Sequence, residues 1–210
     1  MQSPDRGTPG ILRLPREVRD EIYKRVLVIS SPLHLFAEGE ASDKVEVFAP
    51  GKPAQWLALL HTNRQLHSEA SETLYGSHKF VMVDTTSAQA KLLKSFLDKI
   101  GRLNAGYVTS LCINFPTAEP GQSMSILRER CSSLRTLELF VHNKNSQGLV
   151  ASSYEASKLE SIRGLLLQVN AQFAAMPSVQ NVLVKLYHGP LAPEVSELMR
   201  GFGWTVEVGR

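Results

Sequence analysis

The first regular pattern of apolar and polar positions covers residues 14–27. Apolar side chains recur there at helical spacing, with two more apolar side chains beside the main series: Val18, Ile22 and Val26, then Tyr23 and Leu27. Charged residues fill most of the other positions, acidic ones early and basic ones late, which suits the helix macrodipole. The pattern predicts an amphipathic helix that buries this one stripe, with Pro15 at its first position.

Over residues 30–53 the helical pattern gives way to a pattern of short alternating runs. Two short alternating runs, 33–36 and 45–48, are separated by a polar stretch and bracketed by Pro-containing turns. This arrangement predicts a long-looped β-hairpin, inserted between two helices.

A second helix is predicted from about Pro53 to Tyr75, followed by a natural stop at Gly76. Asn63 and His67 fall on or near its apolar stripe. We expect both side chains to bond to the backbone at the edge of the core, rather than to serve as ligands or catalytic groups.

Beyond residue 78 the pattern switches to an alternation of strands and helices. Strands are predicted over 79–83, 109–115, 135–141, 179–187 and 204–208. Helices are predicted over 86–100, 123–131, 154–175 and 193–201, the first ended by Gly101. Strands separated by helices imply crossover connections, and therefore a parallel sheet in an α/β fold.

Three of these strands share one template, apolar-x-x-apolar-x-apolar. Its copies are Val108, Leu111 and Ile113; Leu134, Leu137 and Leu139; and Val179, Val182 and Val184. Degraded copies lie over 77–82 and 203–208. The units resemble leucine-rich repeats in their strands, although their spacing is irregular and the usual Asn or Cys is absent. Packing of this kind predicts helices on one face of the sheet and leaves the other face open.

If the template residues point toward the helices, the residues between them point to the open face. These are Ser110, Cys112, Asn114, Thr136, Glu138, Phe140, Asn181, Leu183, Lys185, Thr205 and Glu207. A mixed polar surface around an aromatic residue is typical of a protein-binding patch. The candidate binding residues are Asn114, Thr136, Glu138, Phe140, Asn181, Leu183 and Lys185. The alternatives are a plain solvated face and a face covered by the 30–53 hairpin.

Two motifs in the first third of the chain resemble a known family. Residues 14–23 read LPREVRDEIY, and residues 60–76 read LHTNRQLHSEASETLYG. In this order they resemble the F-box-like N-terminus of a group of fungal proteins, with the patterns LPxE(I/V)RxxIY and RQ(I/L)xxEAxxxLYG. The 30–53 insertion departs from an ordinary F-box, as does the lack of the Trp that often closes the third helix.

The resemblance implies an interaction module. F-box proteins hold the Skp-family adaptor of a cullin-type ubiquitin ligase with these helices, and a substrate with a C-terminal domain. Carried over to this chain, the adaptor-binding residues would be Leu14, Pro15, Val18 and Ile22, an apolar anchor set near one edge of the first helix. The alternative is that these residues pack on the second helix and fill the core of the module.

The composition and charge narrow the choice of function classes. The chain is 43% hydrophobic with two Cys, which excludes a disordered chain and a disulfide scaffold. It has no apolar run of about 18 residues and no N-terminal signal peptide, so we expect a cytoplasmic or nuclear protein without a membrane partner. Its 23 basic and 20 acidic residues are too balanced to favour nucleic acid, and the basic cluster around Arg128, Arg130, Arg135 and Lys144 is interpreted as a solvated face.

No motif for catalysis or metal binding is found. There is no Walker loop, GxGxxG, GxSxG, HExxH or CxxC, and none of the six His forms an i, i+4 pair. Cys131 has Arg128 and Arg130 nearby, which could activate a thiol, but a small buried Cys is the simpler interpretation. We therefore expect no enzymatic activity, no catalytic residue, no metal and no cofactor.

Together these observations predict an α/β fold in which F-box-like helices pack on a small, mainly parallel, one-sided, leucine-rich-repeat-like sheet. The expected segments are a mobile lead-in over 1–10, a helical module over 11–78 with the hairpin insertion, and β/α repeats over 79–210, the folded parts sharing one core. The function expected first is a non-enzymatic adaptor that recruits a substrate protein to a ubiquitin ligase. The alternatives are a binding scaffold that keeps the helices only as a cap, and an undetected enzyme with a pocket lined by His67, Glu69 or Cys131.

Overall fold

The computed structural model describes residues 10–38, 44–82, 89–116, 120–141, 149, 156–186 and 191–208. Seven strands in this part of the chain form one sheet in the order β2-β1-β3-β4-β5-β6-β7. The strands are β1 (Leu33–Ala37), β2 (Val45–Phe48), β3 (Lys79–Met82), β4 (Ser110–Asn114), β5 (Thr136–Val141), β6 (Asn181–Leu186) and β7 (Thr205–Val208). The helices are α1 (Arg16–Leu27), α2 (Arg64–Ser77), α3 (Gln89–Tyr107), α4 (Pro120–Arg130), α5 (Ala156–Ala174) and α6 (Pro193–Gly201), with 3₁₀ turns η1 (Gly10–Arg13) and η2 (Ala58–His61).

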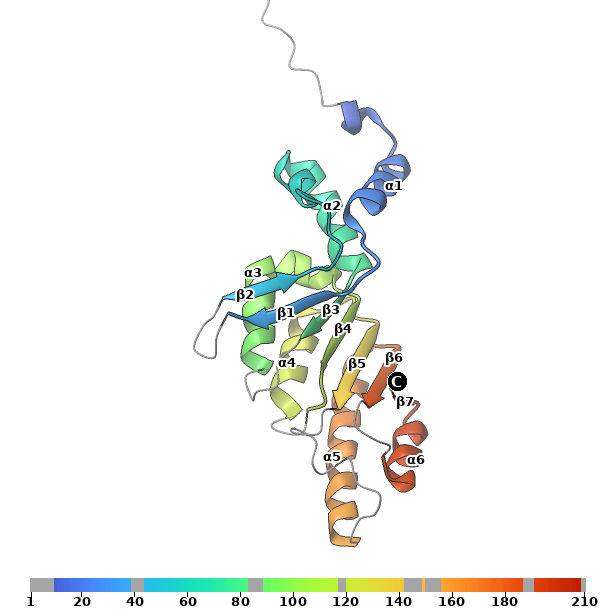
Figure 1. Cartoon of the computed structure of the whole chain (residues 1–210). Helices are drawn as coiled ribbons and strands as arrows, with labels where there is room; N and C mark the ends of the chain where they lie inside the picture. The colour runs from blue at the N-terminus through green and yellow to red at the C-terminus, as the bar shows by residue number, and fades with distance from the viewer. Residues whose placement is uncertain are drawn as a thin grey trace, which may run out of the picture.

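The order of the strands explains why the sheet is covered on one side. From β3 to β7 each strand pairs in parallel with the next strand along the chain. Because crossovers between parallel strands are right-handed, a sheet that grows in one direction places every crossover helix on the same face. Figure 1 shows α3, α4, α5 and α6 on that one side. The predicted α/β fold with a mainly parallel, one-sided sheet is confirmed.

The main core lies between this face and the helices. Template residues of the strands are almost fully buried there: Leu111, Ile113, Leu137, Leu139 and Val184 are each no more than 1% exposed. They pack in one cluster with the apolar sides of α3 to α6. The alternation of the strand template therefore predicted the inward-facing positions of β4, β5 and β6 correctly.

The predicted hairpin is present, but its place differs from the expectation. β1 and β2 pair antiparallel, and β1 also pairs in parallel with β3. The hairpin therefore extends the sheet at one edge, as Figure 1 shows, and does not lie over the open face. Its alternating residues give it one buried side, Leu33, Leu35 and Val45, and that side joins the main core.

The second helix starts later than expected. A 3₁₀ turn, η2, precedes it, and Asn63 caps α2 by accepting a hydrogen bond from the Leu66 N–H at 3.0 Å. His67 Nδ1 lies 2.8 Å from the Leu60 carbonyl, to which its N–H donates. The interpretation of both side chains as backbone-bonded is confirmed.

Gly101 interrupts α3 but does not end it. Its φ of 79° and ψ of 164° are non-helical, and helical structure resumes and continues to Tyr107. Only glycine adopts this backbone conformation without strain, so the predicted break at Gly101 is real. The first helical segment thus ends at Gly101 as predicted, while the second segment, up to Tyr107, was not predicted.

The helical unit, made of η1, α1, η2 and α2, stands beyond one end of the sheet (Figure 1). It has its own small buried cluster, Tyr23, Leu27, Leu66, Ala70 and Leu74. Trp56 and Tyr75 pack against both this cluster and the main core. These two aromatic side chains therefore connect the helical unit to the sheet.

His78 fixes the same junction with hydrogen bonds. The residue is 2% exposed, its Nδ1 donates to the Leu74 carbonyl at 2.8 Å, and its Nε2 accepts from the Ile29 N–H at 3.2 Å. The Trp56 ring meets it edge-on at 6.0 Å. Burial lowers the pKa of His78, against a smaller opposing effect of the Leu74 carbonyl. Protonation would remove the acceptor of the Ile29 N–H, so the neutral ring is the form that holds the junction together.

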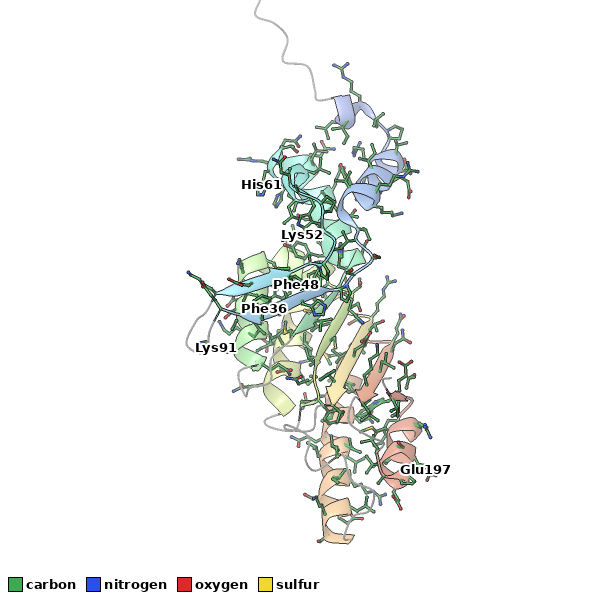
Figure 2. The ribbon with its side chains drawn as sticks, in the orientation of Figure 1. Phe36, Phe48, Lys52, His61, Lys91 and Glu197 are labelled. Carbon is green, nitrogen blue, oxygen red and sulfur yellow. The ribbon has the colours of Figure 1, made fainter. Side chains whose placement is uncertain are left out.

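The need for a neutral His78 ring makes the stability of the folded protein depend on pH. Because the pKa of His78 is lower in the folded state than its ordinary value of 6.5, the unfolded chain binds more protons in the window below that value. The free energy of unfolding should therefore fall as the pH drops below about 6.5. Its slope against pH should correspond to the uptake of at most about one proton on unfolding. Urea unfolding between pH 5 and 8 measures it. His78→Gln should flatten the slope, while His61→Gln, at an exposed position (Figure 2), should leave it unchanged. Equal slopes in all three proteins would contradict the assignment.

Candidate protein-binding surfaces

A buried ion pair determines how α1 packs on α2. Arg19 donates from Nε and Nη2 to the two carboxylate oxygens of Glu69, each at 2.7 Å. The Tyr23 hydroxyl and the Gln65 amide also donate to Glu69, at 2.7 and 2.9 Å. Arg19 Nη1 donates to the Leu14 carbonyl at 2.6 Å, so one side chain ties α2 to the start of α1.

The charges in this cluster are held strongly. The Arg19 hydrogen bonds lower the pKa of Glu69 to about 2, against the effect of its burial. Burial raises the pKa of Tyr23 to about 12, and the Glu69 carboxylate adds to the rise. The carboxylate accepts from three different side chains, which satisfies a charge that would otherwise be costly to bury.

The side of α1 that packs on α2 is therefore Arg19, Tyr23 and Leu27. Of the predicted buried stripe, Tyr23 and Leu27 are buried as expected, but the prediction is wrong for Val18, Ile22 and Val26. Val18 and Val26 are 44% and 43% exposed, and Ile22 is half-buried. Both series repeat every four residues and lie one residue apart, so spacing alone cannot distinguish them. The signal that could have done so is the pairing of Arg19 with Glu69 on the second helix.

The four predicted adaptor-binding residues consequently lie on the surface. Leu14 is 37% exposed, Pro15 and Val18 are exposed, and Ile22 is half-buried. A shallow hollow of about 410 Å³ on the outer side of α1 is lined by Glu17, Val18, Glu21, Ile22 and Arg25. We call Leu14, Pro15, Val18, Ile22 and Val26 the α1 stripe: it is an apolar strip bordered by charges, and the core of the helical unit does not use it.

The open face of the sheet is the second candidate surface. The register of the strands aligns one residue from each strand into a continuous row across the face: Phe48, His34, Val81, Cys112, Glu138, Leu183 and Thr205. The row is aromatic at β2 and β1 and mixes polar and apolar side chains from Glu138 to Thr205. No described helix covers it, since α3 to α6 lie on the opposite face (Figure 1).

The predicted residues of this face occupy the row and its two neighbours. Thr136 and Asn181 lie side by side below it, and Phe140 pairs with Asn114 on one side and Lys185 on the other. Among the seven candidate binding residues of this face, Asn181 is exposed, Glu138 is buried and the other five are half-buried. The sequence analysis missed His34, Phe36 and Phe48, because it assigned the hairpin to the helical module. It also missed Lys79, whose strand carries a degraded copy of the template.

An ion-pair cluster of Glu138 with Lys79 and Lys185 covers the centre of the open face. Lys79 Nζ lies 2.9 and 3.1 Å from the two carboxylate oxygens of Glu138, and Lys185 Nζ lies 3.1 Å from one of them. The Glu138 side chain is only 9% exposed, although no described helix lies over it. The two lysines reach it from β3 and β6 and cover it together with the neighbouring Cys112, which is 6% exposed. The middle of the face is thus covered by its own side chains.

The described residues offer little to support catalysis. Burial raises the pKa of Cys131 to about 12 and that of Cys112 to about 11, the reverse of thiol activation. The Glu69 carboxylate is fully engaged by its three partners, and His67 is bonded to the backbone. The described part of the chain holds no group of three or more residues suited to a metal ion, and none of its helices is long and apolar enough to cross a membrane.

The chain matches no protein-family model, no curated protein and no solved structure.

The Glu69 cluster makes a testable contribution to stability. Glu69→Gln removes the charge that Arg19 needs inside the interface of α1 and α2, and should lower the melting temperature by about 5 °C or more. The matched control is Glu72→Gln on the next turn, whose exposed carboxylate pairs with Arg16 at 2.8 Å and should matter little.

The same cluster predicts that the folded protein loses stability at low pH. Because the pKa of Glu69 is depressed from 4.5 to about 2, its contribution is complete above pH 4.5 and is lost as the pH falls from 4.5 to about 2. Thermal unfolding followed by circular dichroism measures both effects. Equal melting temperatures of the Glu69 and Glu72 variants would show that the buried pair does not hold α1 in place.

Proposed function

We propose that this protein is a non-enzymatic adaptor of the F-box-like kind, which docks a Skp-family component of a cullin-type ubiquitin ligase through the α1 stripe and holds a second protein elsewhere. The observation that carries the proposal is the exposure of that stripe. An amphipathic helix normally buries its apolar side against its own domain. Here α1 is anchored through Arg19, Tyr23 and Leu27, and an additional apolar strip remains on the surface.

The geometry of the stripe suits a helical partner. Val18, Ile22 and Val26 are spaced by four residues and form a straight ridge along the helix. Such ridges pack into the groove of another helix, most often at a crossing angle of about −50°. Glu17, Glu21 and Arg25, which are also spaced by four residues, lie together along one side of the ridge and give its apolar side chains a charged border.

The proposal is tested by calorimetric titration of the full chain with a purified Skp-family adaptor. We expect binding in the micromolar range or tighter, and a loss of at least about tenfold in affinity for Val18→Asp and for Ile22→Asp, since each places a charge in the apolar centre. Val18 is largely exposed, so its variant should keep the melting temperature of the parent protein. Leu167→Asp on α5 is the matched control, because Leu167 is also an exposed helical aliphatic residue, at 50%.

Two results would overturn the proposal. One is a folded parent protein that shows no heat of binding at tens of micromolar. The other is binding that Val18→Asp and Leu167→Asp weaken to the same extent, which would mean that the α1 stripe is not the contact.

The alternative function is a binding scaffold in which the helical unit serves only as a cap on the sheet. The uncovered row across the seven strands favours it, with Phe140 and Leu183 half-buried beside the Glu138 cluster. A scaffold of this type would bind its partner through the sheet. Its binding would then be insensitive to Val18→Asp, which separates the two functions in one series of variants.

A further inference from the structure

β2 is the edge strand of the sheet, and no described strand pairs with its outer side. It comes first in the strand order, with β1 on its inner side. Two of its side chains are strongly exposed, Val47 at 43% and Phe48 at 57%, one on each face of the sheet. An edge strand with exposed apolar side chains is a template for the addition of another strand, and proteins normally protect such an edge.

The alternation of hydrogen-bonded and non-hydrogen-bonded residue pairs in the hairpin shows which backbone groups of β2 face away from β1. The Glu38 N–H donates to the Lys44 carbonyl at 3.1 Å, so residues 38 and 44 form a hydrogen-bonded pair. In an antiparallel ladder these pairs alternate, and residues 46 and 48 therefore also bond to β1. The N–H and C=O groups of Val45 and Val47 must then point away from β1, toward the free edge.

One of these outward groups is capped by a lysine. Lys99, an exposed residue of α3, donates from Nζ to the Val45 carbonyl at 2.9 Å. An added strand would lie about 4.8 Å from β2, with an N–H directed at this same carbonyl. The ammonium group of Lys99 therefore occupies the place of the incoming donor and must move aside. Among the described residues, no side chain caps the Val45 N–H or the backbone N–H and C=O of Val47 in this way.

We propose that β2 accepts an extended acidic segment of a partner protein as an additional strand, with a carboxylate of that segment taking over the Lys99 ammonium. A neutral strand would displace Lys99 from the Val45 carbonyl and return its ammonium group to water, with no contact to replace the lost hydrogen bond. A carboxylate on the helix-facing side of the segment supplies the replacement, as a charge-assisted hydrogen bond. On the other face, an aromatic or β-branched residue packs beside Phe48, whose ring already lies 6.3 Å from that of His34.

Charge also distinguishes this occupant from a second copy of the chain. On the helix-facing side β2 presents Val45 and Val47, while its only carboxylate, Glu46, lies on the opposite face with Phe36. Two copies paired through β2 would bring two Lys99 ammonium groups to one interface to which β2 itself contributes no carboxylate on that side. The site thus selects a different, acidic strand. The proposal concerns the sheet edge and does not depend on the proposed docking through α1.

The test uses the full chain and two fluorescent octapeptides in an anisotropy titration. One alternates tyrosine with glutamate, which places all its carboxylates on one side of a strand, and the other replaces each glutamate with lysine. We expect the acidic peptide to bind at least about tenfold more tightly than the basic one. Lys99→Glu should reverse this preference.

Val47→Pro tests the strand geometry. It removes an outward N–H while leaving the ladder to β1 intact, so it should weaken binding of the acidic peptide at least about tenfold. Val47→Thr, which keeps the N–H, is the matched control and should bind like the parent protein. If Val47→Pro fails to fold, the Lys99→Glu reversal still decides the matter.

Three outcomes would overturn the proposal: equal affinity for the two peptides, acidic-peptide binding that Val47→Pro leaves unchanged, or a preference unaltered by Lys99→Glu. Dimerisation of the chain that Val47→Pro abolishes would also overturn it, by showing that a second copy occupies the edge. Sedimentation velocity at the titration concentrations distinguishes this last case.

Discussion

The buried contact between Arg19 and Glu69 decides which side of α1 faces the rest of the protein. α1 carries two neighbouring series of residues, and either could have packed on α2 by spacing alone. The bidentate ion pair, with the Tyr23 hydroxyl on the same carboxylate, binds α2 through one series and turns the other outward. A polar interaction inside the helical unit therefore creates the apolar surface outside it. Such pairs often contribute little net stability and instead specify one arrangement among several, which is the role assigned to this pair.

A second constraint comes from the sheet. Because the strands from β3 to β7 are added in sequence order, α3 to α6 lie on one face of the sheet. Among the described residues, only side chains can shield the other face and the β2 edge from water. The centre of the open face is covered by Lys79 and Lys185 over Glu138, and the edge is partly capped by Lys99. Lysines protect both places with flexible, charged side chains that a partner can displace. No described side chain covers the α1 stripe in this way, and this difference is why the stripe carries the proposed docking function.

The sequence predicted the fold well and the surfaces only in part. Alternation in the strands identifies their buried side because a sheet has only two faces, and a residue on the wrong one would meet water or the core. A helix has no such binary choice, and the series through Val18 and the series through Tyr23 differ by only about 100° around the axis. The choice was made by contacts between Arg19 and Glu69, which are 50 residues apart. The hairpin was recognised, but its pairing with β3 is also a long-range contact that local pattern does not contain.

The outward orientation of α1 is the central claim, and thiol labelling measures it most directly. The native Cys112 and Cys131 are buried, and burial raises their thiol pKa values to about 11 and 12, so the folded parent protein should react slowly with maleimide. Single cysteines introduced as Val18→Cys and Val26→Cys should react at nearly the rate of a free thiol. Leu27→Cys, at a position with 0% exposure, should react on the order of 100-fold more slowly. Protection at Val18 and Val26 together with rapid labelling at Leu27 would show that α1 packs through the opposite side, and would contradict the account.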